Sequence, residues 1–330
     1  MLENIFLSDS KYFLIPDSYI IGGKVKDYAN TSIVAINPYR HDKGLKPAKD
    51  LLRTLYIKNN VYSFEIWFEN RAKVVFCSSE SELELRKKIT SFYPAAGIYR
   101  PERDYISDML DKVVNGTLAQ VDSNNVIENY SKNMFCTARA DLEKGYCLPL
   151  RTDFDVDPLN TLLTSMIGLK AVYQVVFTPA PQKWMRKAVK GAESLTKGRV
   201  VGWLNPRIEP AGSTEKELSK QMINRAGMPA FAVKIRIAVF GESESIYNFE
   251  SFFRLFHNPV VGQGFKLTVS NQFKELEKMR NREVSIPRFF GRKNVLTCEE
   301  LAALVHIPGE ELHVRELEWT FARKDLKPPA

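Results

Sequence analysis

Basic side chains are concentrated in one segment of the chain, between Gln182 and Arg236. The 330 residues carry 47 Lys and Arg and 39 Asp and Glu, a formal charge of +8. Twelve of the basic residues but only four of the acidic ones lie within the segment, so the rest of the chain is neutral. Closely spaced Lys and Arg displace the counterions of a nucleic-acid backbone. The segment therefore predicts a surface that binds phosphates.

The stretch "PQKWMRKAVKGAESLTKG" in this segment has the period of an amphipathic helix. At about 100° per residue its basic residues share one face, and Trp184 falls on the opposite, apolar face, where it packs inward and does not stack on bases. A strand follows at residues 228–241, whose basic residues alternate with apolar ones and extend the predicted positive surface. The residues expected to bind nucleic acid are Lys183, Arg186, Lys187, Lys190, Lys197, Arg199, Lys234 and Arg236.

Two other interpretations of the basic helix stay open. Basic helix faces are often simply solvated, and a basic amphipathic helix can also lie on an anionic membrane surface. Trp203, in a Gly- and Pro-containing loop after the helix, is a candidate for base stacking.

Alternate carboxylates in "TDFDVDP" could hold a divalent cation. No further carboxylate or histidine is spaced to complete such a site. Asp157, which precedes Pro158, also has the pattern of a helix N-cap. A metal-dependent nuclease or nicking enzyme that uses Asp153 and Asp155 is therefore the alternative hypothesis. Otherwise we expect no catalytic residue, no metal site and no cofactor.

The remaining reactive residue types lack the spacing of a known site. The cysteines have no C-x-x-C pattern, which favours reduced thiols in a cytoplasmic protein, and His306 is expected to be a packed, hydrogen-bonded residue. "IGGKVKD" has Val25 where a phosphate-binding loop needs a hydroxyl, so we expect no ATP hydrolysis. No signal peptide or run of eighteen apolar residues occurs. We expect a cytoplasmic location, with the inner face of the membrane as a further candidate.

The elements that position these residues follow an α+β pattern. Residues 61–99 have the order strand, strand, helix, strand, and residues 170–282 have strands and helices in an order that resembles a ferredoxin-like, split βαβ layer. The sequence thus predicts antiparallel sheets covered by helices. Its length favours two domains, residues 1–150 with short N-terminal strands and residues 151–330 with the basic helix. From about residue 115 to 150 we expect irregular structure.

A well-marked helix lies near the end, in "NVLTCEELAALVHIPG". Thr297 and Glu300 have the spacing of a capping box, in which each side chain satisfies a backbone N–H of the first turn. Leu301, Leu304 and Val305 share one face, and Pro308–Gly309 is expected to stop the helix.

Four stretches, in this order, resemble the region that precedes the motor domain in conjugation-type DNA-translocating ATPases of the HerA/FtsK superfamily. These are type IV secretion-like ATPases of archaeal mobile elements, including plasmids, and of some uncultivated bacterial lineages. The stretches are "SFEIWFENRAKVVFCSS…LRKKITSFYPAA" (63–96), "DPLNTLLTSMIGLKAVYQVVFTPAPQKWMRKA" (157–188), "MPAFAVKIRIAVFG" (228–241) and "NVLTCEELAALVHIPG" (294–309). In that family the last helix leads through a proline-bearing linker to the motor, and "KDLKPPA" stands where the linker would begin.

The resemblance implies a non-catalytic module of a DNA-translocation or conjugation machine. Its expected partners are DNA and an ATPase motor, in cis or in trans. A membrane-bound channel component is a further candidate partner, and a homo-oligomer is compatible with the resemblance. The nuclease hypothesis and a structural scaffold of a virus or secretion apparatus are the alternatives.

Overall fold

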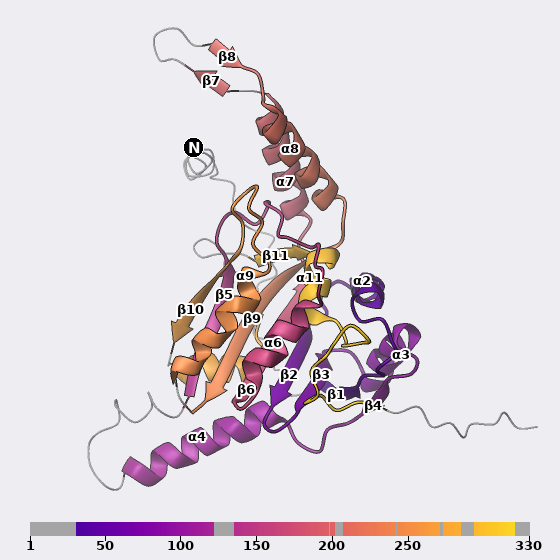
Figure 1. The fold of residues 1–330 in the computed structure, drawn as a ribbon, viewed down its shortest axis with the longest axis vertical. Coiled ribbons are helices and arrows are strands. Elements are labelled where there is room, and N and C mark those ends of the chain that lie inside the picture. Colours follow the sequence, from indigo (N-terminus) through magenta and orange to yellow (C-terminus); the bar gives the residue numbers. More distant parts are fainter. Residues whose placement is uncertain are drawn as a thin grey trace, which may run out of the picture.

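The computed structural model describes residues 31–121, 135–197, 199–201, 207–241, 243–270, 273–284 and 294–320. Within these ranges one nine-stranded antiparallel sheet organises the fold (Figure 1), in the order β10-β5-β9-β6-β2-β3-β1-β4, with β11 also paired to β9. Its strands are β1 Ser32–Asn37, β2 Tyr62–Phe68, β3 Ala72–Ser78, β4 Gly97–Tyr99, β5 Phe135–Leu142, β6 Lys170–Pro179, β9 Ala230–Phe240, β10 Phe265–Ser270 and β11 Asn294–Thr297. The predicted α+β class with an antiparallel sheet is confirmed.

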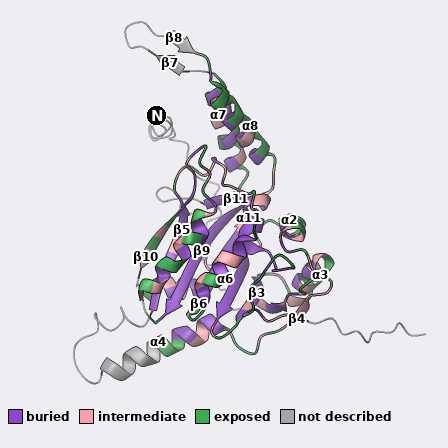
Figure 2. Ribbon diagram, viewed as in Figure 1, coloured by how far each residue is buried: buried purple, intermediate pink, exposed green. Residues whose placement is uncertain are grey.

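Helices cover both faces of this sheet, so the described fold has three layers. The main core lies between one face and the elements α2 Leu45–Thr54, α3 Glu82–Phe92, α6 Pro158–Met166, η3 Ser243–Phe249, α9 Glu250–Arg254 and α11 Cys298–Val305. A second core lies between the other face and the helices α4 Tyr105–Val121 and α10 Phe273–Arg280. Figure 2 shows the central strands β2, β6 and β9 almost entirely in the colour of buried residues, whereas the edge strands β4 and β10 are partly exposed. Burial on both faces explains why the central strands are so apolar.

The central strands β6 and β9 pair along their whole length, from Lys170 opposite Phe240 to Pro179 opposite Phe231. The predicted apolar face of β9 is confirmed, because its alternate residues all lie in the main core: Phe231, Val233, Ile235, Ile237 and Val239. The first two strands predicted within residues 61–99 are also confirmed, and they form the antiparallel pair β2 and β3.

Strand β5 corrects the expectation of irregular structure before residue 150. Most side chains on its apolar half are small, such as Cys136 and Ala138, and they give a weak hydrophobic signal. Its polar half, which includes Arg139 and Asp141, faces the opposite side of the sheet. β5 lies between β10 and β9. The domain boundary expected near residue 150 therefore falls between elements that share one sheet and one core.

A buried carboxylate joins the second core to the sheet. Glu65 is fully buried on β2 and accepts hydrogen bonds from Ser63, Trp67 and Gln174, at 2.8 to 3.0 Å. The Arg282 guanidinium donates to both oxygens of Glu65 and also contacts Asp104 at the start of α4. Because a buried charge is costly unless it is paired, this network fixes the ends of α4 and α10 against the sheet.

The predicted helix starts are confirmed by their caps. The Asp157 carboxylate accepts from the Leu159 N–H, as its N-cap pattern predicts. At α3 the Ser81 hydroxyl accepts from the Glu84 N–H in the same way. Thr297 and Glu300 form the expected capping box of α11, and His306 is its C-cap. Between β9 and β10 the chain forms the 3-10 helix η3 followed directly by the short α9. The strands expected within residues 1–30 lie outside the described ranges.

None of the helices in the described ranges is both long enough and apolar enough to cross a bilayer.

Candidate nucleic-acid interface

A helical arm projects from the end of the two central strands (Figure 1). It consists of α7 Lys183–Thr196, β7 Arg199–Val201, β8 Arg207–Glu209 and α8 Ser213–Ala226, with β7 and β8 paired as a two-stranded ribbon. The arm leaves the sheet after β6 and returns to it at β9, and the Ala180 N–H donates to the Ala230 carbonyl at 2.8 Å across its base. It is therefore a long insertion in the connection between two paired strands.

Small residues let α7 and α8 pack closely. A Cβ placed on Gly191 would lie 2.9 Å from the Met222 Cε, closer than real side chains come. Next to it, the Ser219 hydroxyl donates to the Ala192 carbonyl at 2.9 Å. A larger residue at Gly191 would require the Met222 side chain to move, so the two helices are fitted to each other at this seam.

The basic side chains of α7 lie on the side away from this seam. The buried residues of α7 are Trp184, Ala188, Ala192 and Leu195, and the helical period of about 100° per residue turns the basic positions to the opposite side. We call these exposed residues the basic stripe: Lys183, Arg186, Lys187, Lys190 and Lys197. Figure 2 shows the outer surfaces of α7 and α8 as exposed. The structure thus brings together five of the eight residues predicted to bind nucleic acid.

Lys234 and Arg236 do not extend this surface, and that expectation is wrong. Their side chains are 9% and 4% exposed, because their side of β9 is covered by the layer that contains α10. Burial lowers the pKa of Lys234 and lowers that of Arg236 to about 10. The Arg236 guanidinium donates to the Glu283 carbonyl at 2.7 Å. Both residues belong to the packed interior.

The other predicted positions are only partly placed. Arg199 is the first residue of β7, opposite Glu209, but its side chain lies outside the described part, as does Trp203. Trp184 is buried, as predicted.

Two lysines of α8 add to the positive charge of the arm and were missed as site residues. Lys216 and Lys220 are both exposed on α8. In the sequence, the one indication of their role was that both lie in the basic segment between Gln182 and Arg236. Only the pairing of α7 with α8 shows that they belong to the same projecting element.

The orientation of the arm is set at its base by a buried ion pair. Arg225, near the end of α8, is 4% exposed, and its Nη2 lies 2.8 Å from the Glu300 carboxylate, which is 3% exposed. Arg225 also donates to the carbonyls of Tyr146 and Val295. Its guanidinium lies over the Trp184 ring at 5.6 Å, which joins α8 to the start of α7. One side chain thus contacts both arm helices and the loop, strand and helix beneath them.

Glu300 is held in place by two further contacts. Its carboxylate accepts from the Thr297 N–H at 2.8 Å, as the capping box requires, and from the Leu150 N–H at 3.0 Å. The carboxylate that caps α11 is therefore the same one that receives the arm. Sequence analysis identified the cap but not its second partner.

The three acidic residues at 153–157 have different surroundings. Asp153 is 91% exposed and pairs with Arg151, and Asp155 is also exposed. Asp157 is buried and contacts the His306 Nε2 at 2.9 Å. Within the described ranges no group of three or more His, Cys, Asp or Glu is arranged to hold a metal ion. The geometry does not add support for the nuclease hypothesis.

His306 is a fully buried residue that joins α11 to α6. Its Nδ1–H donates to the Ala302 carbonyl at 2.9 Å, and its Nε2 faces the carboxylate that caps α6. Burial opposes the charge of the imidazole, but the Asp157 charge and these hydrogen bonds outweigh burial and raise the pKa of His306. Burial likewise opposes ionisation of Asp157, yet His306 lowers the pKa of that carboxyl. The two groups therefore stabilise each other's charged form.

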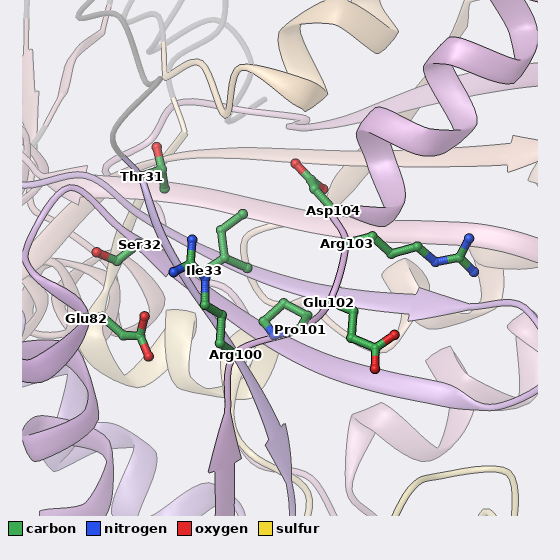
Figure 3. A pocket seen from close by; sticks show the side chains of 9 residues that line it. All are labelled: Thr31, Ser32, Ile33, Glu82, Arg100, Pro101, Glu102, Arg103 and Asp104. Carbon is green, nitrogen blue, oxygen red and sulfur yellow. The ribbon is translucent and has the colours of Figure 1, made fainter.

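A pocket of about 440 Å³ lies between β1 and the start of α4. In Figure 3 the Arg100 guanidinium lies beside Ser32 and Ile33, whereas the Arg103 guanidinium points the other way. Arg103 pairs with Asp108 at 3.0 Å, and Asp104 is held by Arg282. These pairs assign Arg103 and Asp104 to the helix start and the buried network, not to a convergent site.

A family model described as a domain of unknown function (DUF8128) matches residues 24–320, which is most of the chain. The chain belongs to that family. No curated protein matches it.

The Arg225–Glu300 pair is expected to behave as a unit in a double-mutant cycle. Arg225→Met and Glu300→Gln should each lower the free energy of unfolding by about 3 kcal/mol or more, because each leaves a buried group without its partner. The double variant should lose clearly less than the sum. Urea titration measures all four proteins. Arg53→Ala, which breaks an exposed pair with Asp50, is the control and should cause no measurable loss. If the losses of unfolding free energy at Arg225 and Glu300 were additive, the two residues would not act as a pair.

His306 should make stability depend on pH. Its folded-state pKa is raised, so its contribution is complete below the ordinary value of about 6.5 and is lost as pH rises through the folded value. The difference in unfolding free energy between the wild type and His306→Gln should therefore be largest near pH 6 and shrink at alkaline pH. His313→Gln, at an exposed site, is the control for the substitution itself and should cause little loss of unfolding free energy. A constant difference for His306→Gln from pH 6 to 9 would show that the pair is not ionic.

Proposed function

We propose that this protein is a non-catalytic module that contacts DNA and positions a DNA-translocating motor. The basic stripe of α7 is the surface that lies against the phosphate backbone. The observation that carries the proposal is the placement of five exposed basic side chains in one row on a helix that projects from the body. A projecting row can approach a duplex from the side without contact between the duplex and the rest of the fold.

The rigidity of the arm supports this role. A flexible basic segment would lose conformational freedom on binding, whereas a packed helix pair has already lost it during folding. The seam at Gly191 and Ala192 and the ion pair between Arg225 and Glu300 hold the stripe in one orientation. The positive charges of the stripe are therefore held in a fixed row and can attract one phosphate backbone together.

The motor partner rests on the resemblance to the region before the motor of HerA/FtsK-type conjugation ATPases. The four resembling stretches fall on β2, β3 and α3, on α6, β6 and the start of α7, on β9, and on β11 and α11. They include the strands from which the arm projects and the helix that receives its ion pair. In this proposal the motor, in cis or in trans, acts beyond α11, and contact of the arm with DNA sets its position. The module works in the cytoplasm, at the inner face of the membrane when a channel component or a ring of further copies recruits it.

The stripe should account for much of the salt dependence of DNA binding. Replacing Lys183, Arg186, Lys187 and Lys190 by alanine should weaken binding and reduce the slope of log K against log[salt] by about 3 to 4, because each neutralised phosphate contributes about 0.9. Fluorescence anisotropy with a labelled duplex, titrated at several salt concentrations, measures this slope.

A matched control removes the same types of charge from the body of the fold. Its four residues are exposed and lie outside the arm: Lys43, Lys58, Arg71 and Lys112. Alanine at these positions should leave the slope nearly unchanged. Equal effects of the two variants would mean that binding depends on net charge and not on the arm.

Two other outcomes would favour the alternative functions. Cleavage of the DNA with added Mg²⁺, abolished by Asp153→Ala, would favour a nuclease. Salt-insensitive assembly without DNA affinity would favour a scaffold.

A further inference from the structure

The dimensions of the basic stripe define the kind of nucleic acid that it fits. Lys183 and Lys197 are the ends of the stripe, and at about 1.5 Å per residue they lie roughly 21 Å apart along the axis. This is the axial length of about six base pairs, at about 3.4 Å per phosphate in each strand of a duplex. Five charges on a straight line of this length match a charged rod that is itself straight.

The arm offers no exposed aromatic ring along its described helices. In the ranges 183–197 and 213–226 the one aromatic residue is Trp184, which is 3% exposed and lies beneath Arg225. Proteins that prefer single strands stack successive bases on aromatic side chains. Because this contact is missing along the stripe, the described helices offer unpaired bases no aromatic ring to stack on, whereas the Lys and Arg side chains suit phosphates.

The stiffness of the ligand then decides between the two forms of DNA. A duplex has a persistence length of about 50 nm and meets the stripe already ordered. A single strand has to be straightened against it, and nothing along the stripe offsets that loss of freedom. Its lower charge density also releases fewer counterions, about 0.7 per phosphate compared with about 0.9.

We propose that the basic stripe selects double-stranded over single-stranded DNA, through contacts with the phosphate backbone and without regard to sequence. This rests on the proposed function and adds the class of ligand to it. One acidic residue limits the strength of the contact. Glu193 is exposed on α7 between Lys190 and Lys197, three and four residues away, so it repels a phosphate that the stripe attracts.

The test compares a 21-base-pair duplex with each of its single strands by fluorescence anisotropy, using the full chain at one salt concentration. The duplex should bind at least about tenfold more tightly, and a second duplex of scrambled sequence should bind equally well. Glu193→Gln should strengthen duplex binding severalfold. Glu217→Gln, which removes an exposed charge from α8, is the control and should have a smaller effect.

The outcomes separate the two proposals. Equal or tighter binding of the single strands, lost in the quadruple alanine variant of the stripe, would overturn the selection of duplex DNA and leave the proposed function standing. A strong preference for one duplex sequence would also overturn it. Absence of binding to duplex and single strands at low salt would overturn both.

Discussion

The arrangement of the arm depends on one buried ion pair, between Arg225 of α8 and Glu300 of α11. A guanidinium taken out of water is costly unless its donors are satisfied, and here all three nitrogens of Arg225 donate to Glu300 or to backbone carbonyls. These bonds require the base of the arm, β11 and the loop at Tyr146 to occupy one relative position. Without them the arm would meet the body through its two chain connections, the apolar contacts around Trp184 and the packing of Leu195 and Leu218 near Leu148 and Val261.

Because the arm is inserted between β6 and β9, the ion pair holds it against the centre of the sheet. These strands are paired over their full length at the centre of the sheet, and both faces of the sheet are covered. The arm is therefore anchored in the most buried part of the described fold. Helix α11 contacts the base of the arm through Glu300, and it is also tied to α6 through His306 and Asp157. The candidate DNA contact and the last described helix thus share one packed support.

Much of this fold follows from local patterns in the sequence, because strong local signals coincide with the structure. The Thr297–Glu300 capping box, the N-cap at Asp157 and the amphipathic period of α7 each predicted an element correctly. Strand β5 was missed because most of the side chains that it contributes to the main core are small, such as Cys136 and Ala138. Lys234 and Arg236 were misplaced for another reason: alternation along a strand separates its two faces but does not say whether a helix covers the second one. The second role of Glu300 depends on Arg225, 75 positions away, and no local pattern encodes that contact.

The central claim, that this ion pair fixes the arm, is tested most directly by a distance measurement. In a Cys147→Ser background, whose other cysteines are buried, spin labels can be placed at the exposed positions Lys220 on α8 and Thr90 on α3. Pulsed electron paramagnetic resonance should give one narrow distance distribution, which broadens when Glu300→Gln is added while the fold remains intact. A broad distribution in the parent protein, or one that Glu300→Gln leaves unchanged, would contradict the account.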